Sequence, residues 1–196
     1  MKLGNLVLTS IEPGLIIAIV VVVLVIAVVG WWISTSNRLK VMNVKIDEAL
    51  SGIDVALTKR YDLLTKVVAT VKGYAKHEEE TLTKIIAMRN PGSAATLMEK
   101  KEFAQQTAEA IRFLNVVVEQ YPNLKADTQF TFLQNSIGDV EEQLQAARRL
   151  YNANVSAYNQ AIIVFPTSIV ANASHLTKRD FFEAEEIKRE DVKIEF

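Results

Sequence analysis

The stretch from Leu15 to Ile33 carries no charged side chain and is almost entirely aliphatic. As a helix rising about 1.5 Å per residue, it would span about 28 Å, close to the hydrocarbon thickness of a bilayer. A single segment crosses a membrane only as a helix, because lipid offers its backbone groups no hydrogen-bond partners. Pro13 suits the first helical turn, and Trp31 and Trp32 are typical of the membrane–water interface. The sequence therefore predicts a transmembrane helix over residues 14–33, with the lipid bilayer as a partner.

A cleaved signal peptide is the alternative to a permanent anchor. Ser34-Thr35-Ser36 follow the apolar stretch and could form a cleavage site. The stretch is longer than the core of a typical signal peptide, however, and only Lys2 supplies a basic N-terminal region. These features favour an uncleaved anchor that is preceded by a short segment, residues 1–13.

Positive charges flank the predicted span unequally. Only Lys2 precedes it, whereas Arg38, Lys40 and Lys45 follow it closely. Cytoplasmic flanks are enriched in Lys and Arg. We therefore expect a single-pass protein of the cell membrane whose C-terminal domain lies in the cytoplasm.

The charged residues lie almost entirely after the apolar stretch, so the rest of the chain has the composition of a soluble domain. The whole chain has 22 Lys and Arg against 23 Asp and Glu, a formal net charge of −1. A nearly neutral chain lacks the basic face that nucleic acid requires, so we expect no nucleic-acid partner. The chain contains no cysteine, which excludes disulfides, thiolate metal sites and a cysteine nucleophile.

Apolar residues recur at helical spacing through most of the chain, and breaks in that spacing coincide with Gly73, Pro91, Pro122 and Pro166. Proline and glycine interrupt or end helices, so these positions mark connections. The pattern predicts four helices, over residues 14–72, 77–90, 94–120 and 127–164.

The fourth predicted helix has the most regular pattern. Every seventh residue is apolar or aromatic: Phe130, Ile137, Leu144, Tyr151, Tyr158 and Phe165. A second series begins three residues later: Leu133, Val140, Ala147, Asn154 and Ala161. Such a heptad repeat is typical of helices that pack knobs-into-holes against other helices.

The first predicted helix continues past the membrane with an apolar stripe of its own. Its members are Leu39, Ile46, Leu50, Ile53, Leu57, Leu64, Val67 and Val71. Arg60 interrupts this stripe. Either its stem packs while its head reaches solvent, or Arg60 forms a core ion pair with an acid on a facing helix, because an unpaired buried guanidinium is costly.

Together these patterns predict an all-α protein. Its N-terminal transmembrane helix continues into an elongated antiparallel four-helix bundle over residues 34–166, followed by an extended C-terminal tail over residues 167–196. The tail ends with Asp191 to Phe196, which alternate polar and apolar residues as an extended strand does.

Several segments of the chain resemble the LemA family. They are Ser51-Gly52-Ile53-Asp54, Lys59-Arg60-Tyr61-Asp62-Leu63, Val71-Lys72-Gly73-Tyr74-Ala75, Tyr121-Pro122-Asn123-Leu124-Lys125-Ala126, Tyr151-Asn152, Tyr158-Asn159, Phe165-Pro166 and Phe181-Phe182-Glu183-Ala184-Glu185-Glu186. Thr65-Lys66 departs from the Pro-Asn that family members often carry. The resemblance implies a single-pass membrane protein with a helical bundle and implies no reaction. Family genes often neighbour HtpX-type membrane proteases, and one branch is associated with magnetosome membranes.

Residues that could support chemistry are sparse. His77 and His175 are far apart, and no second histidine follows His77-Glu78-Glu79-Glu80 at zinc-binding spacing. Asp47 and Asp54 share a helix face at a spacing of about 10 Å, too wide for a tight carboxylate pair. We expect them to be solvated or paired with cations. The sequence therefore predicts no catalytic, cofactor-binding or metal-binding residue, and no enzyme activity.

Candidate interaction residues lie in two places. The first is the end of the fourth helix, where two Tyr-Asn pairs precede a wide apolar face: Tyr151, Asn152, Val155, Tyr158, Asn159, Ile162, Ile163 and Phe165. The tyrosines and asparagines either bind a partner or have a structural role, their polar groups satisfied within the bundle. The second place is the alternating end of the tail: Val192, Ile194 and Phe196.

We expect a non-enzymatic, membrane-anchored helical-bundle protein that forms homo-oligomers and acts as a scaffold for membrane organisation. The alternative is an adaptor or regulator of a membrane protease in HtpX-type quality control, which would add a membrane-protein partner.

Overall fold

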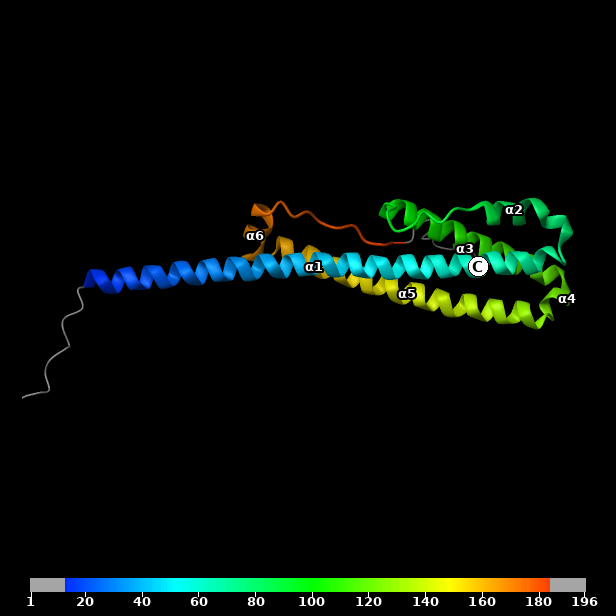
Figure 1. The fold of residues 1–196 in the computed structure, drawn as a ribbon, viewed down its shortest axis with the longest axis horizontal. Helices are drawn as coiled ribbons and strands as arrows, with labels where there is room; N and C mark the ends of the chain where they lie inside the picture. The colour runs from blue at the N-terminus through cyan, green and yellow to red at the C-terminus, as the bar shows by residue number, and fades with distance from the viewer. Residues whose placement is uncertain (1–12, 184–196) are drawn as a thin grey trace, which may run out of the picture. The chain divides into compact units, whose positions relative to one another are not determined.

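The structure is a computed structural model that describes residues 13–183, and residues 1–12 and 184–196 lie outside the described part. Every regular element in the described part is a helix (Figure 1). The elements are α1 Pro13–Lys72, the 3-10 turn η1 Lys76–Glu78, α2 Glu79–Ala87, α3 Leu97–Gln120, α4 Pro122–Lys125, α5 Thr128–Ile163 and α6 Thr167–Ala173. The predicted all-α fold is confirmed. The predicted strand-like end of the tail, including Val192, Ile194 and Phe196, lies outside the described residues.

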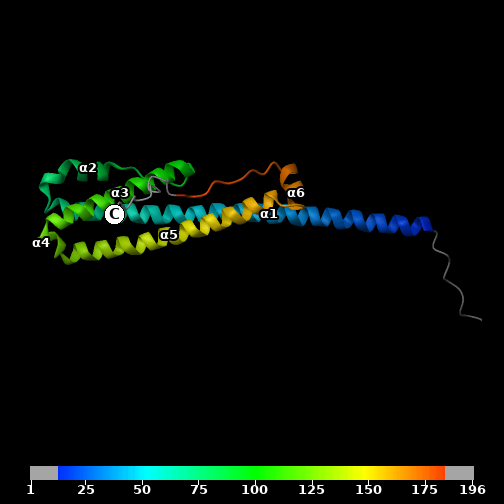
Figure 2. The same cartoon turned by 180° about the vertical axis from the view of Figure 1, so that it is seen from behind.

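The chain forms two compact units. The N-terminal unit comprises the chain up to Asn43 together with Tyr158–Lys178, and the main unit comprises Val44–Ala157 together with the chain from Arg179 onward. Both divisions fall inside long helices, which Figure 2 shows from behind, so α1 and α5 contribute to both units.

In the N-terminal unit, α1 exposes its apolar side chains on every side from Gly14 to Ile33. The stretch is long and apolar enough to cross a membrane, and none of it is buried within the protein. The first buried side chains of α1 are those of Thr35 and Leu39. The end of α5 and α6 lie beside this part of α1 in both views (Figures 1 and 2).

In the main unit, side-chain contacts define the direction of each helix relative to α1. The Asn154 amide donates to the Lys45 carbonyl oxygen at 3.1 Å, and Arg60 pairs with Glu141 farther along, so α5 runs antiparallel to α1. Lys100 pairs with Asp54 near the start of α3, and α3 then runs parallel to α1.

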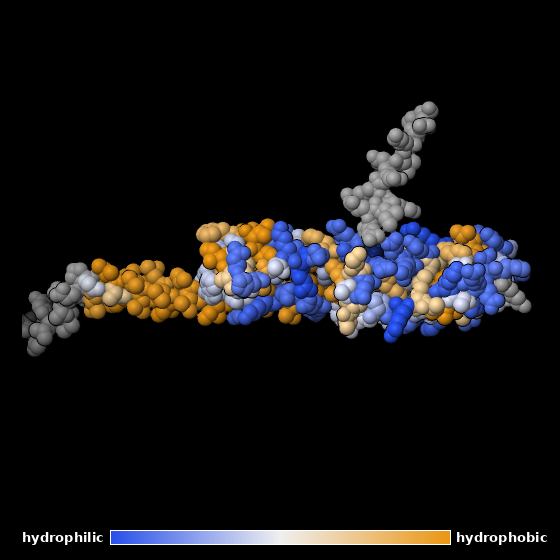
Figure 3. All heavy atoms as spheres, turned by 90° about the horizontal axis from the view of Figure 1, so that it is seen from above, coloured by the Kyte–Doolittle hydropathy of each residue, from blue (hydrophilic) through white to orange (hydrophobic). Residues whose placement is uncertain are grey.

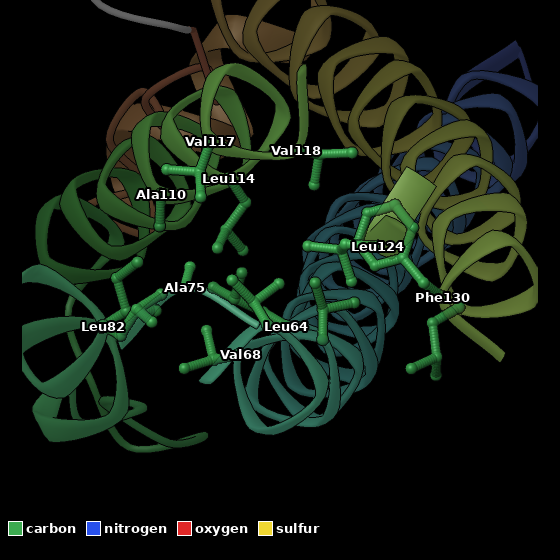
Figure 4. Close-up of a cluster of buried hydrophobic side chains, with 14 of the residues drawn as sticks. Leu64, Val68, Ala75, Leu82, Ala110, Leu114, Val117, Val118, Leu124 and Phe130 are labelled. Atoms are coloured by element: carbon green, nitrogen blue, oxygen red, sulfur yellow. The ribbon is translucent and has the colours of Figure 1, made fainter. Parts of the chain in front are cut away.

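The core of the main unit gathers side chains from α1, α2, α3, α4 and α5 (Figure 4). Its labelled members are Leu64, Val68, Ala75, Leu82, Ala110, Leu114, Val117, Val118, Leu124 and Phe130. Leu124 comes from α4, a four-residue helix that the sequence pattern did not predict. Because Leu124 is fully buried, this short connection contributes to the core and does more than link α3 to α5.

Polar side chains fix where helices begin. Thr96 and Glu99 form a reciprocal capping box at the start of α3, which places that helix start three residues later than predicted. The Asp127 carboxylate accepts hydrogen bonds from the backbone N–H groups of Gln129 and Phe130 at the start of α5, at 2.7 and 3.0 Å. These contacts satisfy donors that have no partner within the first helical turn.

The predicted heptad series of α5 is buried at Phe130, Ile137, Leu144, Tyr151 and Tyr158. Phe165, the last member of the predicted series, is instead 76% exposed. The reason is that α5 ends at Ile163, so the helical periodicity no longer directs Phe165 toward the buried face.

The predicted extended tail begins with a helix instead. Thr167–Ala173 form the seven-residue α6, in which Val170 and Ala171 are buried. A helix this short depends on packing for its stability, which sequence periodicity cannot reveal. After His175, whose positive φ of 51° ends the turn that follows α6, the chain has no regular secondary structure up to Glu183.

Candidate interaction site

A groove of about 390 Å³ in the main unit is bordered by α1, α3 and α5. This volume lies within the roughly 300–1,000 Å³ range of ligand-binding clefts. Its apolar lining comes from Val67, Ala108, Ile111, Leu114, Phe130 and Ile137. Its polar lining comes from Arg60, Arg112, Asn115, Gln134 and Glu141. We call this feature the α3–α5 groove; its apolar surface beside two arginines suits a segment that is both apolar and acidic.

Arg60 is the buried charge of the groove, with 4% of its surface exposed. Its Nη2 lies 2.9 Å from Glu141 Oε2, and Glu141 itself stays partly exposed. Its Nη1 donates to the Ala104 carbonyl oxygen at 3.2 Å and to Thr107 Oγ1 at 3.4 Å. The sequence left two arrangements open for Arg60, a head that reaches solvent and a buried ion pair. The structure has the buried ion pair.

The electrostatics of Arg60 follow from this environment. Burial lowers the pKa of the Arg60 guanidinium below its usual value, and Glu141 opposes the shift. Arginine remains charged in proteins, so the groove contains a permanent cation. The Nε of Arg60 is buried and has no hydrogen-bond partner among the described residues. An unsatisfied buried donor costs free energy, which an acceptor entering from outside would relieve.

A second buried cation was not anticipated from the sequence. Lys100 in α3 is almost fully buried, pairs with the Asp54 carboxylate and donates to the Ser93 carbonyl oxygen at 3.1 Å. Asp47 likewise pairs with Arg179, so both acids singled out in the sequence have cationic partners. A lysine in a helical segment is normally a solvated residue, and only its spacing from Phe103 and Ala104 could have suggested burial.

Tyr151 and Asn152 bind a segment of their own chain. The Tyr151 hydroxyl donates to the Asp180 carbonyl oxygen at 2.9 Å. Asn152 Oδ1 accepts from the Phe182 N–H at 2.8 Å, and its Nδ2 donates to the Phe182 carbonyl oxygen at 3.2 Å. The first Tyr-Asn pair therefore has a structural role, because it fixes the extended segment 180–182.

The Phe182 ring completes this contact, which we call the clamp: Arg148, Tyr151 and Asn152 around Phe182. The ring is buried, packs edge-on against Tyr151 with centroids 6.4 Å apart, and lies 5.0 Å from the Arg148 guanidinium carbon. Burial raises the pKa of the Tyr151 hydroxyl, which stays protonated and donates its hydrogen bond at neutral pH.

The remaining predicted interaction residues differ in accessibility. Val155 is buried in the main unit, and Tyr158 and Ile162 are buried in the N-terminal unit, where Asn159 is partly exposed. Ile163 and Phe165 are exposed, at 58% and 76%. These last two are the most exposed of the described members of the predicted set.

The structure describes His, Asp and Glu side chains over residues 13–183. No cluster of three or more His, Asp or Glu residues suited to a metal ion occurs within that range. His77 and His175 belong to different units and are both exposed.

These features define an all-α protein class, with an N-terminal helix apolar enough to anchor it in a membrane and a charged helical unit that carries a groove. The chain belongs to the LemA family, whose model matches residues 49–196. The resemblance found in the sequence motifs is thereby confirmed.

Two relatives illustrate this kinship. A protein named LemA from Metamycoplasma hominis is 31% identical over 163 residues, which cover 82% of this chain and 74% of that protein. The magnetosome protein MamQ from Magnetospirillum gryphiswaldense is 27% identical over 73 residues, which cover 37% of this chain and 27% of that protein.

Proposed function

We propose that this protein is a non-enzymatic, membrane-anchored scaffold that self-associates, with the C-terminal residues 184–196 of one copy binding in the α3–α5 groove of another. The observation that carries the proposal is the groove itself, an apolar cleft beside a buried arginine whose Nε has no acceptor within the described chain.

Charge complementarity supports this choice of occupant. Arg60 and Arg112 line the groove, and its one acid, Glu141, is already paired with Arg60. Residues 184–196 contain five acidic and three basic residues. A segment with excess negative charge suits a groove with excess positive charge, which favours both encounter and register.

The apolar pattern of the segment supports it independently. Val192, Ile194 and Phe196 alternate with charged residues, so in an extended chain they share one side. That side matches the apolar lining of Val67, Phe130 and Ile137 in the groove.

The test uses the full-length chain in detergent, with the oligomer mass measured by light scattering. Deleting residues 184–196 or changing Arg112→Glu should each reduce the mass to that of a monomer. Arg112 is exposed, so its replacement should leave the fold intact. Arg89→Glu, at another exposed arginine of the main unit, is the control and should leave the oligomer unchanged.

Mixing the two defective chains separates binding between copies from binding within one copy. The deletion variant keeps an intact groove, and the Arg112→Glu variant keeps an intact C-terminal segment. Binding between copies predicts that the mixture associates although neither chain does so alone. A mixture that stays monomeric would contradict binding between copies, and the self-association mechanism would be wrong.

An adaptor for a membrane protease is the second candidate, favoured by the same open groove, which another protein's acidic segment could also enter. A protease partner should co-purify in stoichiometric amount, be lost with Arg112→Glu and be retained when residues 184–196 are deleted. Loss in both variants would instead tie the association to the chain's own segment.

In this proposal the main unit faces the cytoplasm, as the cations Arg38, Lys40 and Lys45 suggest. A protease added outside intact cells should then spare the main unit. Complete digestion of that unit under these conditions would show that the main unit lies outside the cell and that the assigned orientation is wrong.

A further inference from the structure

The N-terminal unit has a second exposed apolar surface outside the span. Ile163 and Val164 end α5, Phe165 follows in the turn, and Ile169 lies in α6. All four are roughly half exposed or more, and Phe165 reaches 76%. We call them the α5–α6 corner. Contiguous exposed apolar residues of this kind usually mark a contact surface.

The corner lies beside the part of α1 where the span ends. Figure 3, turned about the horizontal axis of Figure 1, shows hydrophobic surface both along the apolar stretch of α1 and over the region of α6. The buried residues Thr35 and Leu39 mark where this unit packs on α1. Trp32 precedes Thr35 by less than one helical turn, roughly 5 Å along the axis. The corner is therefore continuous with the lipid-facing surface at the level of the interfacial tryptophans.

The charge of the unit points to the same environment. Within residues 13–43 and 158–178, the charged side chains are Arg38, Lys40 and Lys178, and neither Asp nor Glu occurs. All three cations are exposed. A surface that combines exposed apolar groups with cations and lacks acids matches the boundary of an anionic bilayer, where each cation near the headgroups contributes to binding.

We propose that the α5–α6 corner inserts into the interfacial layer of the bilayer that holds the N-terminal span, with Arg38, Lys40 and Lys178 at the level of anionic headgroups. This inference rests on the membrane anchoring in the proposed function and does not require self-association. The bilayer then contacts the chain at two points distant in sequence, the span and the corner.

The absence of cysteine from the chain makes a site-specific test direct. Phe165→Cys and Ile169→Cys are labelled with an environment-sensitive fluorophore in the full-length chain. The control is Phe132→Cys, because Phe132 is an exposed aromatic residue of the main unit with 70% exposure. The labelled chains are inserted in phosphatidylcholine vesicles, with or without phosphatidylglycerol, that contain a lipid-borne quencher.

Insertion of the corner predicts several-fold stronger quenching at positions 165 and 169 than at position 132. Quenching should increase with phosphatidylglycerol, and the double variant Arg38→Gln, Lys40→Gln should reduce that increase, because only Lys178 of the three cations then remains. Vesicle flotation verifies that the chain is inserted at all.

Two results would overturn the inference while leaving the anchor in place. One is equal quenching at positions 165 and 132 in chains that float with the vesicles. The other is a label that is shielded from water but not quenched by lipid, with a shielding that increases with the protein-to-lipid ratio. That result would show that the corner contacts a second copy of the chain. Failure of the chain to float would overturn the anchoring itself, and the inference with it.

Discussion

From Gly14 to Ile33, α1 exposes its apolar side chains all round, whereas in the main unit the same helix buries a stripe of them. The chemistry of the charges differs in parallel. The described N-terminal unit contains cations and no acid, while the main unit pairs Arg60, Lys100 and Arg179 with carboxylates. The same helix thus has two different surroundings. Its apolar stretch suits lipid and needs no side-chain partner within the protein, whereas a charge that it buries in the protein core needs an ionic or hydrogen-bonding partner.

The largest effect should come from removing the buried arginine. Arg60→Ala removes a buried stem and leaves the Ala104 carbonyl oxygen and Glu141 without their cation, so we expect a loss of about 4 kcal/mol in the free energy of unfolding. Arg38→Ala in the N-terminal unit is the matched control and should cost less than about 0.5 kcal/mol. Urea denaturation of the full-length chain in micelles, followed by circular dichroism, measures both. Equal losses of unfolding free energy in the two variants would show that the two stretches of α1 do not differ in how they hold their cations.

The next effect concerns the lysine of α3. Lys100→Met preserves side-chain volume but leaves Asp54 partly buried and unpaired, so we expect a loss of about 2–3 kcal/mol by the same measurement. Adding Asp54→Asn should recover part of this loss, because the unpaired charge is gone. Lys40→Met, at an exposed lysine of the N-terminal unit, should be nearly neutral. A neutral Lys100→Met variant would mean that Asp54 is adequately solvated alone.

Phenylalanines from the two units allow a third comparison. Phe182→Ala empties the clamp and should cost about 1–2 kcal/mol, less than a central core phenylalanine, because the segment lies near the chain end and detaches alone. Phe165→Ala removes an exposed ring and should leave stability in micelles unchanged within about 0.5 kcal/mol. If Phe165→Ala were the more destabilising change, the α5–α6 corner would be part of a protein core.

The smallest effect is a pH dependence at the start of α5. Hydrogen bonds from the Phe130 N–H and the Tyr74 hydroxyl, together with that from the Gln129 N–H, lower the pKa of the Asp127 carboxyl. A lowered folded-state pKa contributes stability above the unfolded value and loses it as pH falls through the folded value. Asp127→Asn should therefore weaken the decline in stability as the pH falls from about 5 to about 2, around and below the value of about 3.9 for an unfolded aspartate. An unchanged pH profile would show that the cap works equally well without charge.

The helices were predictable from the sequence because periodic burial leaves a direct pattern. The heptad residues from Phe130 to Tyr158 are buried as their spacing implied. The spacing also singled out Arg60 as a charge on a buried stripe. It did not identify Glu141, since an acid beside a heptad position looks like any solvated residue until the facing helix is placed.

The groove and the clamp were not predictable in the same way. The groove depends on how α1, α3 and α5 are spaced across the main unit, and no local pattern encodes that distance. The Tyr-Asn motif left a partner-binding and a structural role open, and only the return of Asp180 to Phe182 along α5 distinguishes them. Short helices such as α6 escape prediction for a related reason, because their stability comes from contacts rather than from periodicity.

The two hydrogen bonds between Asn152 and Phe182 have an evolutionary consequence. Asn152 contacts the N–H and the carbonyl oxygen of residue 182, groups that almost every amino acid carries. Sequence drift at position 182 can erode the ring contact with Arg148 but cannot remove the amide pairing, except by introducing proline, which lacks the N–H. The hydrogen bonds that hold residue 182 on α5 therefore tolerate most substitutions at that residue, and they depend on the single asparagine Asn152.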